Sequence, residues 1–240
     1  MDLSLGEYAI AAAAVLVGAT VQGSIGFGVN LLSAPVIAIV HPSALPGAIV
    51  ILALPLSTAT ALRERHAIER ESLEWLAAGA VPGTLIGLGI VRAVSTDTLA
   101  VIVGGIAVLG VAVSLVVREI VVNRTSATLT GLASGTMGAA AGVGGPPVGL
   151  LFQRHGGPIV RSTLGAFFMF TGVLTAIGLV AVGKVHRDQL LFAAALAPPM
   201  ATGLWASRHF HGLVDRGWMR PAILALSGTA GLVAIVHGLT

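Results

Sequence analysis

The chain has no cysteine, one lysine and few charged residues, which make up 10% of its 240 positions. Without cysteine there is no disulfide framework, no thiolate metal site and no thiol redox chemistry. A soluble domain carries roughly 25% charged residues, whereas this chain is 55% hydrophobic. A shell facing water cannot be built from such a composition, so we expect an all-α, polytopic membrane protein.

The few charges also exclude several functions. All ten acidic residues lie at the ends of apolar stretches, not at span centres, where carboxylates typically mark proton relays. The basic residues are spread singly rather than clustered on one face, which argues against nucleic-acid binding. His209 and His211 form the closest histidine pair and are assigned to a loop, so no metal site and no cofactor are expected. No acid or histidine accompanies the serines and threonines of the spans, which disfavours an intramembrane enzyme.

The apolar residues form eight stretches, and a spanning helix needs about 20 such residues. Six stretches fit one span each: 44–62, 73–91, 98–117, 162–183, 190–206 and 221–239. The stretches 5–41 and 127–153 are too long for one helix, and both contain clustered glycines. We therefore expect each of these two to form a broken helical hairpin.

The two halves of the chain resemble each other. A shift of 116 residues aligns Gly26 with Gly142 and Pro82 with Pro198. Several other glycine, proline and arginine positions also coincide at this shift. This predicts a duplicated unit, with repeat 1 at 1–118, a linker at 119–126 and repeat 2 at 127–240.

Lysine and arginine indicate how the repeats cross the membrane. If all eight stretches cross once, the two sides carry seven and six of these residues; if both broken stretches return to the side they entered, the split is ten against three. The second arrangement satisfies the positive-inside rule. Each repeat is then a re-entrant or short hairpin plus three spans, and the repeats have inverted topology. Both termini are expected outside the cytoplasm of a multi-pass protein of the cell (inner) membrane.

The breaks themselves predict a binding site. Glycine permits a chain reversal, Pro146 suits the first turn of a returning helix, and Asn30 can cap the other returning helix. Each half-helix would then point its free amides at the centre of the protein, where they can bind an anion. Close helix packing is the alternative role for such glycines. The predicted substrate-binding residues are Gln22, Ser24, Gly26, Gly28, Asn30, Ser134, Thr136, Gly142, Gly144, Gly145 and Pro146.

Four segments carry a family resemblance. They read GSIGFGVNLLSAP (23–35), VPGTLIGLGI (81–90), GLASGTMGAAAGVGGPPVGLL (131–151) and, more weakly, PPMATGLWASR (198–208). With their duplicated setting they resemble the sulfite exporter TauE/SafE family of membrane permeases. The first break, GFGVN, has fewer glycines than family members often carry. The resemblance implies transport, often outward, of small sulfur-containing anions such as sulfite, sulfonates, sulfoacetate or thiosulfate.

We therefore expect a secondary transporter, an exporter of such anions, that works by alternating access between its inverted repeats. The alternatives are an anion channel or an accessory subunit of a larger membrane complex. The expected partners are the small anion and membrane lipid, and the small-residue helix faces would allow a homodimer.

Overall fold

The computed structural model describes residues 4–95 and 120–214, with isolated positions between 98 and 112. The predicted span 221–239 and most of 98–117 lie outside the described residues. Every regular element in the described part is helical: α1 Leu5–Ile25, α2 Val29–Val40, η1 Pro42–Ala44, α3 Gly47–Arg63, η2 Arg65–Ala67, α4 Arg70–Ala93, α6 Arg124–Ala141, α7 Gly145–Leu151, α8 Gly157–Ala181 and α9 Arg187–Val214. Four of these helices are long and apolar enough to cross a membrane, namely α1, α4, α8 and the Arg187–His209 part of α9.

Both long apolar stretches are interrupted at their glycines. Helix α1 ends at Gly26, which has φ 97°, and α6 ends at Gly142, which has φ 72°. A side chain is strained in this left-handed region, so glycine is the natural residue at both turns. Each turn leads within three residues into a shorter helix, α2 or α7, that runs back along its partner.

The start of α2 differs from the sequence-based expectation. Asn30 was expected to cap this helix, but Gly28 is the N-cap residue and no side chain makes a capping bond. Gly28 adopts φ 131°, and the helix begins two residues earlier than expected. Asn30 therefore lies in the first helical turn, and the expectation that it caps the helix is wrong.

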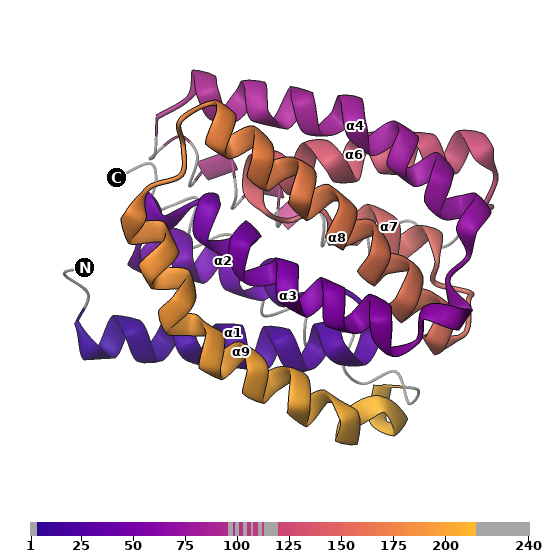
Figure 1. Cartoon of the computed structure of the whole chain (residues 1–240), viewed down its shortest axis with the longest axis horizontal. Helices are drawn as coiled ribbons and strands as arrows, with labels where there is room; N and C mark the ends of the chain where they lie inside the picture. Colours follow the sequence, from indigo (N-terminus) through magenta and orange to yellow (C-terminus); the bar gives the residue numbers. More distant parts are fainter. Residues whose placement is uncertain are drawn as a thin grey trace.

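The helices pack in three pairs. Helix α1 lies along α9, α4 lies along α6, and α3 lies along α8 between them (Figure 1). Helices α4 and α6 pack most closely because glycines on each helix face the backbone of the other. A Cβ on Gly87 would lie 2.6 Å from Thr136 O, and a Cβ on Gly135 would lie 2.6 Å from Ala80 O. Small residues permit such close backbone approach between membrane helices.

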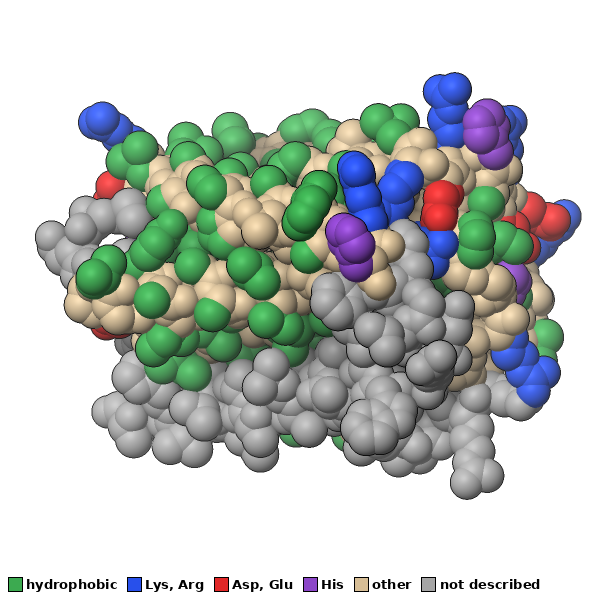
Figure 2. Space-filling view, turned by 90° about the horizontal axis from the view of Figure 1, so that it is seen from below, with side chains coloured by type: hydrophobic (Ala, Val, Ile, Leu, Met, Phe, Trp, Pro, Cys, Tyr) green, Lys and Arg blue, Asp and Glu red, His purple; other side chains and the backbone are tan. Residues whose placement is uncertain are grey.

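Polar contacts define the two ends of the bundle. At one end Tyr8 Oη donates to Ala195 O at 2.9 Å, and Gln189 Nε2 donates to Ser43 O at 3.0 Å. The first hairpin therefore starts and finishes at the same end, beside the start of α9. At the other end Glu69 N donates to Thr163 Oγ1 at 3.0 Å. Figure 2 shows apolar side chains over the middle of the described surface and most Lys and Arg side chains towards one end.

Candidate functional site

A cavity of about 60 Å³ lies where the tips of the two hairpins meet α3 and α8. One water needs only about 10–15 Å³ by this measure, so the cavity has room for a solute of a few heavy atoms. The lining residues are Gln22, Phe27, Gly28, Asn30, Leu31, Val50, Ala53, Leu54, Ser57, Ser134, Gly138, Gly142, Val143, Gly144, Gly145, Phe168, Thr171, Gly172 and Thr175.

Gln22, near the end of α1, organises the first hairpin tip. Its Oε1 accepts from Val29 N at 3.2 Å, and its Nε2 donates to Ser57 Oγ at 3.2 Å. Gln22 is 4% exposed, so these bonds are shielded from competing solvent. The side chain therefore joins α1, the start of α2 and the middle of α3.

The start of α2 supplies backbone donors to the cavity wall. The first intrahelical bond runs from Leu32 N to Gly28 O at 3.2 Å, and the earlier amides of a helix have no acceptor within it. Gln22 satisfies Val29 N, which leaves the amides of Gly28, Asn30 and Leu31. The buried Asn30 Oδ1 has no hydrogen-bond partner within the described residues.

The start of α7 is chemically different. Pro146 and Pro147 follow Gly145 in the first turn, and proline has no N–H to offer. Ser134 Oγ donates to Gly144 O, which fixes the carbonyl side of the turn. The second half-helix thus presents only the amides of Gly144 and Gly145, so the two hairpin tips are not equivalent donors.

Phe27 connects the two hairpins directly. A Cβ on Gly145 would lie 2.8 Å from Phe27 Cδ2, and a Cβ on Gly149 would lie 2.6 Å from Phe27 Cε1. The ring of the first tip therefore rests on the glycine face of α7, where a larger side chain would displace it.

The structure brings most of the predicted site residues together. Those that line the cavity are Gln22, Gly28, Asn30, Ser134, Gly142, Gly144 and Gly145.

Four predicted residues lie outside the lining. Ser24 Oγ donates to Thr20 O at 2.7 Å and to Ser207 O at 3.4 Å, facing α9. Thr136 Oγ1 donates to Leu132 O within α6 at 2.9 Å. Gly26 packs against the backbone of Arg161, and Pro146 is buried in α7 without lining the cavity.

Sequence reasoning missed the contribution of α8. Phe168, Thr171, Gly172 and Thr175 line the cavity, and their i, i+3, i+4, i+7 spacing places them on one helix face. That spacing is visible in the sequence and was the available signal. Ser57 on α3 gave no comparable signal, since the nearby Thr58 and Thr60 do not continue with it the i, i+3, i+4, i+7 spacing found on α8.

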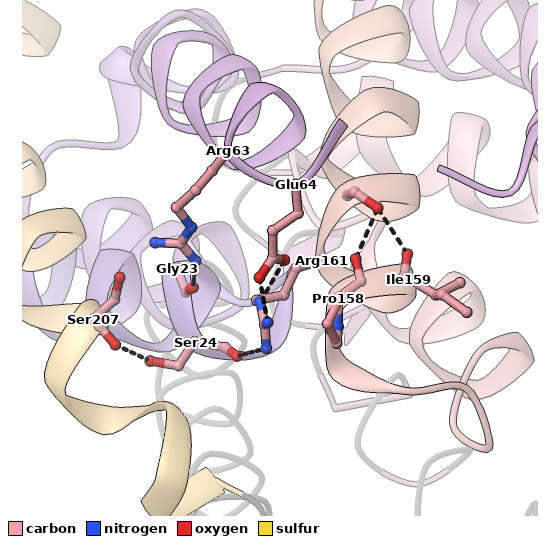
Figure 3. A network of polar contacts seen from close by, with 9 residues as sticks. Gly23, Ser24, Arg63, Glu64, Pro158, Ile159, Arg161 and Ser207 are labelled. Carbon is pink, nitrogen blue, oxygen red and sulfur yellow. Dashed lines mark hydrogen bonds and ion pairs between the residues drawn. The ribbon is translucent and has the colours of Figure 1, made fainter. Parts of the chain in front are cut away.

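None of the described residues that line the cavity is charged or a histidine. A cluster of charged side chains lies at the end of α1 (Figure 3). Arg63 Nη2 donates to Gly23 O at 2.6 Å, and Arg161 Nη1 donates to Ser24 O at 3.4 Å. Arg161 Nε also donates to Glu64 Oε2 at 2.9 Å. Cations favour the carbonyl end of a helix, so this cluster anchors the end of α1 to α3 and α8.

The described wall of the cavity is thus neutral. Its polar groups belong to the hairpin tips, Ser57 and the two threonines Thr171 and Thr175, and its aromatic rings are those of Phe27 and Phe168. Across the described positions no group of three or more His, Cys, Asp or Glu side chains could hold a metal ion. Such a wall can bind and orient a small solute through hydrogen bonds, and it brings together no acid–base or nucleophilic pair.

Comparison with known proteins identifies a family. The family model described as Sulfite exporter TauE/SafE matches residues 10–234, a range that includes every lining residue named above. No curated protein matches the chain significantly, and no solved structure does.

Proposed function

The chain belongs to the sulfite exporter TauE/SafE family, and on that premise we propose that it exports small sulfur-containing anions such as sulfite, sulfonates or sulfoacetate. Membership of this transporter family, together with four apolar helices long enough to span a bilayer, makes the chain a membrane transporter. The proposal adds the substrate, the site and the alternating-access cycle.

The observation that carries the proposal is the cavity between the two hairpin tips. Its donors include the first-turn amides of α2 and the hydroxyls of Ser57 and Thr175, a set that suits the oxygen atoms of an oxyanion. Discontinuous helices that meet inside the bilayer are the usual place for a transporter to bind its substrate.

Inverted repeats would supply the alternating access. Gly26 and Gly142 take equivalent left-handed turns, and Thr20 and Thr136 each bond the carbonyl four residues earlier. The helix pairs also correspond, because exchanging the repeats turns the α4–α6 pair into the α9–α1 pair. These equivalences support a pseudo-two-fold relation between residues 1–118 and 127–240.

The charge distribution supports one orientation in the cell membrane. The described end that contains the α3 C-terminus and the α8 N-terminus carries Arg63, Arg65, Arg70, Arg124, Arg154 and Arg161, whereas Arg92, Lys184 and Arg187 belong to the opposite end. By the positive-inside rule the first end faces the cytoplasm, and the N-terminus of α1 lies on the other side.

The test is flux through proteoliposomes that contain the purified full chain, with sulfite, thiosulfate, sulfoacetate, taurine and sulfate as solutes. A carrier gives saturable flux that one substrate competes away from another. Flux that rises linearly with concentration supports the channel alternative, and no flux for any solute supports the accessory-subunit alternative.

A matched pair of variants ties the flux to the cavity. Thr175→Val removes a lining hydroxyl at nearly constant volume, and we expect it to lower the apparent affinity for the anion about fivefold to tenfold. Thr202→Val removes an exposed hydroxyl that bonds Pro198 O on α9, and it should leave flux unchanged. Equal effects of the two variants on flux would contradict the proposal that the anion binds in the cavity during transport.

A further inference from the structure

The part of the cavity wall that the structure describes is polar but carries no charged side chain. Among the described residues, its lining contains hydroxyls, amides, glycines and hydrocarbon side chains, and no Lys, Arg, His, Asp or Glu. We propose that this site, if it binds anions as proposed above, selects singly charged oxyanions over doubly charged ones, and that a weakly acidic substrate enters with its proton still attached.

The physical reason is that the desolvation cost of an ion and its attraction to neutral dipoles depend on its charge in different ways. The cost of moving an ion from water into a protein cavity grows with the square of its charge and is large even for one unit. The attraction to fixed neutral dipoles, such as the amides of Asn30 and Leu31, grows only in proportion to the charge. A dianion therefore gains twice the attraction but meets about four times the desolvation cost.

A nearby cation would relieve this cost, but Arg161 on α8 and Arg63 on α3 do not line the cavity and have their own partners. Arg161 precedes the first lining residue of α8, Phe168, by seven positions, which is about 10 Å along a helix. It holds Glu64 Oε2 at 2.9 Å and also bonds Ser24 O. Arg63 follows Ser57 by six positions and donates to Gly23 O at 2.6 Å.

The described elements that line the cavity contribute no titratable group among their lining residues that could carry a proton. In the described part of the chain these groups lie at helix ends: Glu7 and Tyr8 on α1, His41 after α2, Arg63 and Glu64 at the end of α3, Arg124 at the start of α6, and Arg161 near the start of α8. A proton that crosses with the substrate is therefore carried by the substrate, which binds it on one side and can release it to water on the other.

The experiment measures binding of three probes to the purified full chain at a series of pH values. Methanesulfonate is a monoanion throughout, sulfate is a dianion at neutral pH, and sulfite changes from hydrogensulfite to the dianion as the pH rises. We expect methanesulfonate to bind at least about tenfold more tightly than sulfate, with an affinity that does not change with pH. The apparent affinity for sulfite should fall as the pH rises.

Three results would overturn the inference while the proposed transport function stands. Sulfate could bind as tightly as methanesulfonate, sulfite affinity could rise with pH, or methanesulfonate could show the same pH dependence as sulfite, which would place the titrating group on the protein. Failure of all three probes to bind would overturn this inference and the proposed function together.

A charge-placing variant supplies an independent check. Thr171 lines the cavity and is half-buried, so a lysine there can reach a bound solute. Thr171→Lys should shift the sulfate-to-methanesulfonate affinity ratio towards sulfate by about tenfold or more, whereas the long neutral side chain of Thr171→Gln should leave the ratio unchanged. If a folded Thr171→Lys protein kept the same sulfate-to-methanesulfonate affinity ratio, the charge of the cavity wall would not control the selectivity between the two anions.

Discussion

Gln22 on α1 and Ser57 on α3 are joined by a hydrogen bond of 3.2 Å between Nε2 and Oγ. The same glutamine holds the first amide of α2 through its Oε1. One side chain therefore sets the distance between the broken hairpin and a wall of the cavity, and this side chain is only 4% exposed.

Replacing Gln22 by methionine keeps the length of the side chain and removes both bonds. We expect Gln22→Met to lower the free energy of unfolding by about 1–3 kcal/mol, because Val29 N and Ser57 Oγ lose their partner, and to weaken anion binding markedly. Gln189→Met is the control, since Gln189 is also buried and bridges to Ser43 O, far from the cavity. The control should lose similar stability but keep its affinity; loss of affinity in both would point to a general packing effect.

The glycines between α4 and α6 should tolerate no side chain. A Cβ on Gly79 would run into Thr128 O, whereas a Cβ on Gly89, also on α4, meets nothing within 4 Å. Gly79→Ala should therefore lower the free energy of unfolding by about 1–3 kcal/mol, and Gly89→Ala should raise it by up to about 1 kcal/mol through helix propensity. Thermal unfolding in detergent measures both, and equal midpoints would show that these helices are not in backbone contact.

The ion pair between Glu64 and Arg161 should be coupled energetically. The two side chains are only 22% and 11% exposed, whereas those of the Glu71–Arg124 pair are 74% and 72% exposed. A double-mutant cycle with Glu64→Gln and Arg161→Met should give a coupling energy of about 1–3 kcal/mol. The same cycle on Glu71 and Arg124 should give less than about 1 kcal/mol. A larger coupling energy for Glu71 and Arg124 than for Glu64 and Arg161 would show that the Glu64–Arg161 pair does not form in the membrane.

Orientation can be read directly because the chain has no cysteine of its own. Ser43 and Gly156 are both exposed and lie at opposite ends of the bundle. In cells, a membrane-impermeant maleimide should label Ser43→Cys from outside, and Gly156→Cys only after the membrane is permeabilised. Reversed labelling would invert the proposed orientation, and labelling of both from one side would contradict the arrangement of the helices.

The fold could be predicted from the sequence where backbone chemistry is restrictive. The breaks near Gly26 and Gly142 follow from clustered glycines inside apolar stretches, because only such residues reverse the chain without strain. The helical interpretation of the remaining stretches follows from their length and apolarity. The family resemblance stated from four segments is confirmed by a match that covers nearly the whole chain.

The wall of the site could be predicted only in part, because it depends on which helix packs beside the breaks. Thr171, Thr175 and Ser57 come from α8 and α3, and their own segments carry no mark of a cavity beyond the spacing on α8. Ser24 and Thr136 were predicted because they are polar and close to a break, yet each bonds a carbonyl of its own helix. Proximity in sequence does not decide which way a helical side chain points.

The pairing of the helices decides which parts of the protein can move together. The tightest contacts, α4 with α6 and α1 with α9, each join a helix from the first half of the chain to one from the second. Neither half is therefore an independent rigid body. One mobile unit would contain α1, α2 and α9, the other α4, α6 and α7, and the seam that opens between them would follow α3 and α8 rather than the boundary between the two predicted repeats.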